Sequence, residues 1–184
     1  MSDKMCIILV GPPCCGKSSV GKTVASRLGI DYISSGDIAR RMAQSNTQVN
    51  EDLVDGKMAP ENEMRRIISE KLWQRFIKMG KNVIILDGFP RFGEQAVWLR
   101  DLLPHIIDIK YVLLNVPLST IIERSADRNR NDDKSLEQRL KYYYNTTYKE
   151  LSDHIDIVID ANENTVDECS ALLIHYIEEV RKYC

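Results

Sequence analysis

The chain lacks several features that would assign it to a function class at once. None of its apolar runs is long enough to cross a bilayer. Its 25 basic and 27 acidic residues nearly cancel to a net charge of -2, so no general basic field predicts binding to nucleic acid or to an anionic membrane. Five cysteines without a CxxC pair, and three scattered histidines, argue against a disulfide framework and a structural zinc site.

These absences leave a globular protein with one core. At 184 residues and 43% hydrophobic, the chain has the size and composition of a single domain with small insertions. Its first apolar run begins by about residue 5, which leaves no space for a targeting segment ahead of it. We therefore expect a cytoplasmic protein, and we expect a monomer without nucleic-acid or membrane partners.

The most informative motif present is a phosphate-binding loop. Residues 11–18 read GPPCCGKS, which matches the pattern GxxxxGK[ST], and they directly follow the apolar run 6–10. Glycines let backbone N–H groups curl around phosphate oxygens, and the N-terminus of the next helix adds its dipole. Lys17 supplies positive charge and Ser18 a hydroxyl for magnesium. The apolar spacing over 17–28 is helical, which favours this interpretation over an ordinary glycine-rich turn.

The order of apolar and helical patterns predicts the fold. Strands are expected at 6–10, 32–33, 83–86, 111–116 and 155–159, and helices at 17–28, 36–45, 60–79, 94–103, 118–128, 136–151 and 166–182. Buried strands that alternate with helices indicate an α/β fold with a five-stranded parallel sheet covered by helices. The polar stretch 35–80 is longer than one crossover needs, so we expect a helical insertion there.

Large aromatic side chains outside the motifs are expected to be structural. Trp73 and Trp98 are predicted to anchor the core. The tyrosines of one long helix are predicted to pack against the core or lie at its rim: Tyr142, Tyr143, Tyr144 and Tyr148.

A carboxylate ends the third expected strand. Asp87 follows the apolar run 83–86 at once. A residue of this kind beside a phosphate loop normally holds magnesium, often through water. Ser18 and Asp87 are therefore the candidate metal ligands, and Mg²⁺ is the expected cofactor.

The segment that begins at Asp87 carries a more specific pattern. Residues 87–91, DGFPR, followed by Gln95, resemble a signature of the adenylate kinase family of nucleoside monophosphate kinases. The same family has a Thr/Ser-Gly-Asp-x-x-Arg run and a Gly-x-x-x-Pro segment, matched here by SGDIAR at 35–40 and GKMAP at 56–60. Residues 123–140 resemble the lid region of the family. The resemblance covers nearly the whole chain.

The resemblance implies a P-loop fold in three parts. The core would comprise residues 1–34, 81–127 and 134–184. Residues 35–80 would form a helical subdomain that binds the nucleoside monophosphate. Residues 128–133 would form a very short lid, which makes the chain a short or minimal lid form.

The resemblance also implies a reaction and the residues that carry it. ATP would transfer a phosphoryl group reversibly to AMP, giving two ADP, with ATP and AMP as the partners and Mg²⁺ as cofactor. Because two polyanions must meet, arginines from several segments suit the task. The implied catalytic residues are Lys17, Arg91, Arg128, Arg130 and Arg139. The implied ATP-binding residues are Gly11, Pro12, Cys14, Cys15, Gly16, Lys17, Ser18, Ser19 and Arg124. The implied AMP-binding residues are Ser35, Gly36, Arg40, Ala59, Gly88, Arg91 and Gln95.

The sequence departs from the family pattern in its loop and its lid. Cys14 stands where the family keeps a glycine, and a glycine kept in a loop often has a positive φ that costs other residues about 1 kcal/mol or more. The thiols of Cys14 and Cys15 are either inert fillers or sites whose oxidation gates phosphate binding. The lid has only Asn129 between Arg128 and Arg130, so we expect it to exclude water poorly.

Three alternatives differ in acceptor and in class. Gln95 matches the adenine-specific members of the family, whereas uridylate-cytidylate kinases have asparagine there. Ala39 and Ala59 replace larger residues of many relatives and widen the pocket, which keeps a UMP/CMP kinase or a broad-specificity kinase open. A non-catalytic nucleotide-binding protein is the third alternative. Retention of Lys17, Asp87 and the set of arginines argues against it.

Overall fold

The computed structural model describes residues 4–126 and 136–182, which form a helix-covered parallel sheet. Its strands are β1 (Lys4–Val10), β2 (Asp31–Ser34), β3 (Val83–Asp87), β4 (Ile107–Asn115) and β5 (Ile155–Asp160). They lie in the order β2-β3-β1-β4-β5, and every neighbouring pair is parallel. The predicted α/β class and five-stranded parallel sheet are confirmed.

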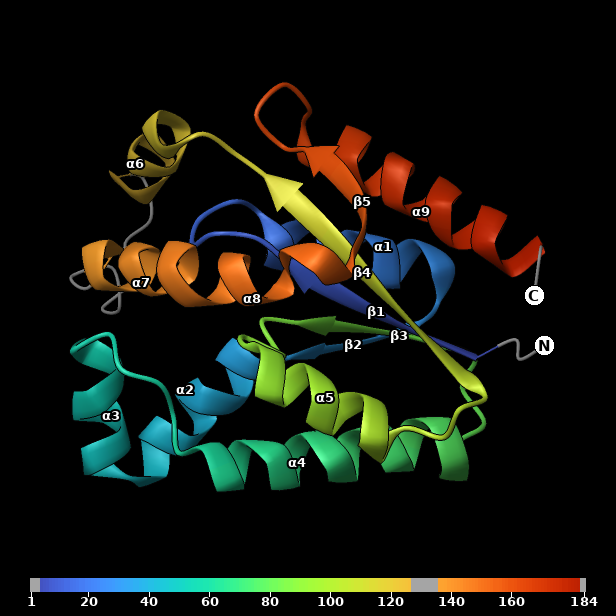
Figure 1. Cartoon of the computed structure of the whole chain (residues 1–184), viewed down its shortest axis with the longest axis horizontal. Helices are drawn as coiled ribbons and strands as arrows, with labels where there is room; N and C mark the ends of the chain where they lie inside the picture. Colours follow the sequence, from blue (N-terminus) through green and yellow to red (C-terminus); the bar gives the residue numbers. More distant parts are fainter. Residues whose placement is uncertain (1–3, 127–135, 183–184) are drawn as a thin grey trace.

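Helices connect the strands (Figure 1). They are α1 (Lys17–Leu28), α2 (Ser35–Ser45), α3 (Thr47–Val54), α4 (Glu61–Trp73), α5 (Gly93–Leu102), α6 (Leu118–Ala126), α7 (Leu136–Tyr142), α8 (Lys149–Leu151) and α9 (Val166–Lys182). Two π-helical segments, η1 (Gln74–Lys78) and η3 (Tyr143–Tyr148), continue α4 and α7, and a 3₁₀ turn, η4 (Ser152–His154), leads into β5. Within the described residues, no helix combines the length and apolar content that spanning a bilayer requires.

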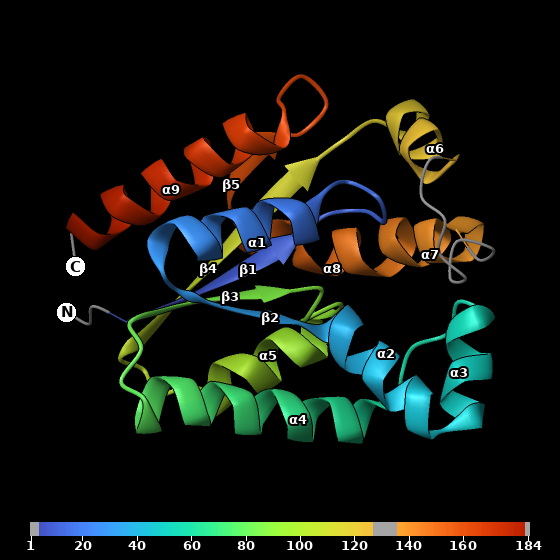
Figure 2. The same cartoon turned by 180° about the vertical axis from the view of Figure 1, so that it is seen from behind.

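Both faces of the sheet are covered, as the two opposite views show (Figures 1 and 2). Helices α1 and α9 cover one face, where their contributions to the core are Val20, Val24, Ala25, Cys169, Leu173 and Ile177. Helices α2, α4 and α5, with residues 143–151, cover the other face. This double burial explains why β1 is buried from Met5 to Val10 and β3 throughout, without polar alternation.

The carboxyl ends of the strands meet where α1 and α2 begin. Leu9 of β1 and Ser34 of β2 are both register partners of Asp87, the last residue of β3. The loop after β1 leads into α1, and α2 follows β2 without a gap. Ligand sites in open parallel sheets form at this edge, outside the strand ends.

One strand begins earlier than the sequence predicts. We expected the fourth strand at 111–116, but β4 starts at Ile107. Asp108 and Lys110 interrupt its apolar pattern and concealed its first half. Lys110 Nζ lies 3.1 Å from Asp108 Oδ2 and 3.7 Å from Asp156 Oδ1, so these charges are paired within the sheet.

The helical regions also differ in detail from the prediction. Helix α3 was missed, although Asn46 caps it by accepting a 3.2 Å hydrogen bond from the Val49 N–H at Oδ1. The two long helices expected at 60–79 and 136–151 each change to π-helical winding partway. The insertion does contain helices, but the assignment of 35–80 to monophosphate binding stays a prediction, and the lid at 128–133 lies outside the described residues.

The aromatic predictions were partly wrong. Trp73 is 57% exposed and anchors no core. Trp98, on α5, is partly buried against the core, with its ring 5.7 Å from that of Phe89 in an edge-on arrangement. Tyr143 is buried, whereas Tyr144 and Tyr148 lie at the surface, as the prediction of packing and rim positions states.

Candidate active site

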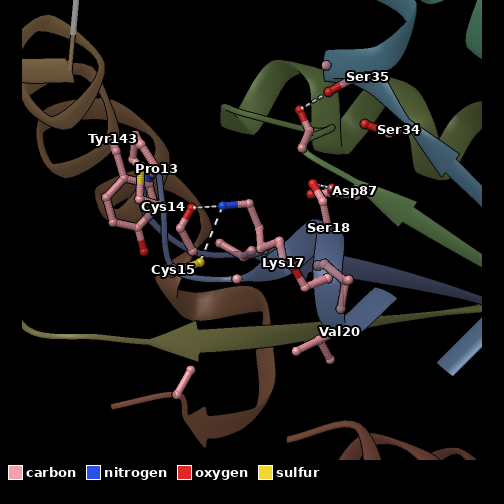
Figure 3. Close-up of a pocket in the computed structure, with 18 of the residues that line it drawn as sticks. Pro13, Cys14, Cys15, Lys17, Ser18, Val20, Ser34, Ser35, Asp87 and Tyr143 are labelled. Carbon is pink, nitrogen blue, oxygen red and sulfur yellow. Dashed lines mark hydrogen bonds between the residues drawn. The ribbon is translucent and has the colours of Figure 1, made fainter. Parts of the chain in front are cut away.

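A cavity of about 480 Å³ opens at the carboxyl edge of the sheet (Figure 3). Most of the sequence-predicted site residues line it: Gly11, Cys14, Cys15, Gly16, Lys17, Ser18, Ser19, Ser35, Gly36, Arg40, Asp87, Gly88, Arg91, Arg124 and Arg139. Pro12, Ala59 and Gln95 do not belong to its lining. Arg128 and Arg130 lie outside the described residues. The fold therefore gathers residues from widely separated segments, while their individual roles stay predictions.

The loop from Gly11 to Ser18 curls because of its glycines. Gly11 has φ +154°, and a Cβ there would lie 2.7 Å from both Cys15 Sγ and the Leu114 carbonyl oxygen. Gly16 has φ +101° and immediately precedes α1, whose N-terminal N–H groups therefore open onto the cavity. This is the arrangement that binds phosphate at a helix N-terminus.

Lys17 lies folded across this loop. Its Nζ donates hydrogen bonds to the carbonyl oxygens of Gly11 at 2.6 Å and Pro12 at 2.8 Å. It also lies 3.5 Å from Cys15 Sγ, as Figure 3 shows. Pro12 thus takes part through its carbonyl group although it does not line the cavity. The loop backbone holds the ammonium group at the cavity, where a phosphate would meet it.

Cys14 adopts the backbone conformation of the glycine it replaces. Its φ is +62°, in the left-handed region, and it is the one non-glycine residue with positive φ in the described part of the chain. The loop keeps its course, and the Cβ of Cys14 is accommodated at a cost in backbone strain of about 1 kcal/mol. Cys15 is 1% exposed, and its thiol packs into the core beneath the loop.

This strain predicts an inverted order of stability at position 14. We expect Cys14→Gly to be more stable than Cys14→Ala by about 1 kcal/mol, because both lack the thiol and only alanine retains the strained Cβ. At an ordinary helical position such as Ala43 in α2, alanine should instead be more stable than glycine by a similar amount. Urea unfolding of the matched pairs measures both differences. Equal stability of the two Cys14 variants would contradict the left-handed conformation.

Ser18 and Asp87 meet at the cavity floor. Ser18 Oγ donates a 2.7 Å hydrogen bond to Asp87 Oδ2 (Figure 3), and the Tyr32 hydroxyl donates one of 2.5 Å to the same oxygen. Asp87 is only 4% exposed. Burial and the adjacent Asp87 raise the pKa of Tyr32, so its hydroxyl stays protonated and remains a donor.

The donor set at this point fits magnesium. A carboxylate and a hydroxyl are hard oxygen ligands of the kind that Mg²⁺ prefers. Among residues 4–126 and 136–182, no group of three or more His, Cys, Asp and Glu side chains is arranged to hold a metal. Mg²⁺ in nucleotide sites usually takes its other ligands from phosphate oxygens and water.

Arg91 lines the cavity in the turn after β3, where it is anchored to Gly88. Its Nε donates a 2.9 Å hydrogen bond to the Gly88 carbonyl oxygen, which also accepts one of 2.7 Å from Ser35 Oγ. Gly88 has φ +75°, and a Cβ there would lie 2.7 Å from Ser35 Oγ. Loss of hydration lowers the pKa of Arg91, and the positive charge of Arg139 lowers it further. Arginine nevertheless stays charged, so these two cations line the same cavity, an arrangement that suits an anionic ligand.

Three predicted nucleotide contacts have partners within the protein. Arg40 lines the cavity and lies 2.5 Å from Asp37 Oδ1. Gln95 is 4% exposed, and its Oε1 accepts a 2.8 Å hydrogen bond from the Arg91 N–H, so the side chain braces the turn that presents Arg91. Arg124 donates to the Ala161 carbonyl oxygen at 2.7 Å and connects α6 to the segment after β5.

Sequence reasoning missed part of the lining. The additional residues include Tyr142, Tyr143, Thr147, Asn164, Thr165, Val166 and Cys169. Tyr143 and Thr147 are four residues apart, and both are buried in the π-helical segment η3. The sequence predicted Tyr143 to be a packing or rim residue, and it gave no sign that Thr147 lines a site.

Comparison with known proteins agrees with this geometry. Residues 9–156 match the family model described as "Adenylate kinase". The adenylate kinase of Corynebacterium aurimucosum is 32% identical over 171 residues, which cover 88% of this chain and 92% of the relative. "Adenylate kinase 1" of Synechocystis is 33% identical over 149 residues, covering 77% and 78% respectively. The alignment with the adenylate kinase of Chlamydia muridarum, 31% identical over 137 residues, covers 66% of this chain but only 54% of that relative.

The family match spans the phosphate loop, the DGFPR segment and the helices between them. It therefore includes most of the residues that the fold brings to the cavity. The chain belongs to the adenylate kinase family, and it is a phosphotransferase of the nucleoside monophosphate kinase type.

Proposed function

We propose that this protein transfers the terminal phosphoryl group of ATP to AMP, reversibly and with Mg²⁺, to give two ADP. The observation that supports this most is that cationic side chains from separate segments line one cavity. The phosphate loop with Lys17 would form one cationic wall, and Arg40, Arg91 and Arg139 would contribute to the other. A protein that binds a single nucleotide would need only the first.

The donor would lie along the loop. Its phosphates would meet the N–H groups at the start of α1 and the ammonium group of Lys17, in exchange for the carbonyl contacts of that lysine. Arg124 lines the same part of the cavity beside Cys15 and would contact the donor nucleotide. Magnesium, held near Ser18 and Asp87, would neutralise charge on the transferring phosphate.

The acceptor would lie against the wall formed by α2 and the turn after β3. The guanidinium group of Arg91 suits bidentate binding of a phosphate, and Arg40 approaches from α2. Transfer between two phosphates needs mainly alignment and charge neutralisation, which arginines from separate elements provide. One chain supplies both walls, and we therefore also propose a monomer. A cytoplasmic location stays a prediction.

AMP is the acceptor we propose over other nucleoside monophosphates. Initial rates with AMP, GMP, CMP and UMP, each at equal concentration with Mg·ATP, test this choice. We expect AMP to be used at least about tenfold faster than the others, a discrimination that one or two base contacts supply. A preference for CMP or UMP would contradict the proposal and favour the pyrimidine kinase alternative.

A further inference from the structure

Tyr32 belongs to none of the sequence motifs, yet its hydroxyl reaches the carboxylate proposed to hold magnesium. The same oxygen, Asp87 Oδ2, accepts hydrogen bonds from Tyr32 at 2.5 Å and from Ser18 at 2.7 Å. In the ladder between β2 and β3, Tyr32 is the partner of Ile85 and Ser34 is the partner of Asp87. Tyr32 and Asp87 thus lie on one face of the sheet, separated by a diagonal that an aromatic side chain can span.

Packing fixes the ring of Tyr32 in this place. The ring lies against α1 at Gly21, where a Cβ would come within 2.6 Å of ring atom Cε2 and 2.9 Å of Leu9 Cδ1. Lys22 Nζ lies 5.9 Å from the ring centroid. A residue larger than glycine at position 21 would therefore push the ring away. Because packing fixes the ring of Tyr32, the hydroxyl that the ring carries is also held in one position.

The two hydroxyls on Asp87 come from different kinds of element. Ser18 is the last residue of the phosphate loop and lies in the first turn of α1, and its oxygen is also the one expected to bind the cation. A hydroxyl has one hydrogen and two lone pairs, so Ser18 can donate to Asp87 and bind a cation through a lone pair, but a shift of its oxygen toward the cation changes the length of that hydrogen bond. Tyr32 is held in a strand of the sheet, and its hydroxyl is not expected to bind the cation. It can keep Oδ2 in place while Ser18 moves.

We propose that Tyr32 is a positioning residue for magnesium, which holds the Asp87 carboxylate in the orientation that the cation requires. The proposal rests on the proposed function, because it concerns the Mg·ATP site of that reaction. Asp87 is almost fully buried, and a buried carboxylate without donors on its oxygens would be both costly and poorly oriented. By donating to Oδ2, the Tyr32 hydroxyl both offsets the cost of burying the Asp87 carboxylate and fixes its orientation. The other carboxylate oxygen, Oδ1, then stays available to the cation and its water.

Equilibrium binding of ATP with and without magnesium tests the proposal. Isothermal titration gives one dissociation constant in excess MgCl₂ and another in EDTA, and their ratio measures how far the metal strengthens binding. In Tyr32→Phe the ring remains against Gly21 and only the hydroxyl is lost. We expect the ratio to fall about tenfold or more, the factor that one hydrogen bond to a charged group supplies, with little change in EDTA.

Tyr176→Phe is the matched control, because Tyr176 packs at the same face of the sheet but does not line the cavity. It should keep the wild-type ratio. A wild-type ratio in Tyr32→Phe would overturn the proposal. An equal rise of the ATP dissociation constants in MgCl₂ and in EDTA would also overturn it, because it would indicate a purely structural role for the hydroxyl. If the wild type itself binds ATP equally with and without Mg²⁺, the magnesium assignment of the proposed function fails, and the proposal for Tyr32 fails with it.

Discussion

Replacing Lys17 by methionine is expected to reduce kcat for ADP formation from ATP and AMP by at least about 1000-fold. Methionine keeps much of the length of the side chain but has no charge. The ammonium group lies against the carbonyl oxygens of Gly11 and Pro12, within the loop that would receive the donor phosphates. Without this ammonium group, the negative charge that develops on the transferring phosphoryl group is no longer neutralised by the nearest cation of the loop.

The assay needs a control for charge loss in general. Lys78→Met removes an exposed lysine of η1 that does not line the cavity, and it should keep wild-type kcat. Thermal unfolding of both variants separates loss of catalysis from loss of fold. A Lys17→Met enzyme that is folded and retains more than about a tenth of the wild-type rate would contradict the role of the loop in phosphoryl transfer.

Arg91→Lys is expected to lower kcat/KM for AMP by about 100-fold, with less than about a threefold change in KM for ATP. Lysine keeps the positive charge but lacks the planar fork that binds the Gly88 carbonyl oxygen with one N–H and can present others to a phosphate. The effect should fall on the acceptor because Arg91 lies on the wall of the turn after β3.

Arg66→Lys provides the matched control for this substitution. Arg66 forms an exposed ion pair with Glu70 on α4 and does not line the cavity, so the same change of residue type there should leave both kinetic constants unaltered. If Arg91→Lys instead raises KM for ATP as much as it lowers kcat/KM for AMP, the division of the cavity into donor and acceptor walls is wrong.

Most parts of the site that the sequence predicted are encoded by contiguous residues. A phosphate loop is a local structure, and its glycines, lysine and serine act within eight positions. The meeting of Ser18 and Asp87 was also predictable, since a residue that ends a buried strand beside the loop is the usual partner of its hydroxyl. Even Cys14 retains the backbone course expected of a glycine.

The parts that could not be predicted depend on contacts between distant segments. Tyr32 reaches Asp87 through strand register and through space left by Gly21, and neither of these is a sequence pattern. Tyr143, in the π-helical segment η3, lines the cavity, whereas the sequence indicated only that it packs against the core or lies at its rim. The start of β4 at Ile107 was hidden because its charged residues find partners only within the assembled sheet.

The most direct test of the account is the stoichiometry of the reaction with purified protein. ATP and AMP are mixed in equal amounts with Mg²⁺, and all three adenine nucleotides are measured by chromatography over time. We predict that two ADP form for each AMP consumed, that EDTA stops the reaction, and that Lys17→Met shows no comparable rate. ADP formation that proceeds without consumption of AMP, or a wild-type rate no higher than that of the variant, would contradict the assignment of this cavity to phosphoryl transfer between two nucleotides.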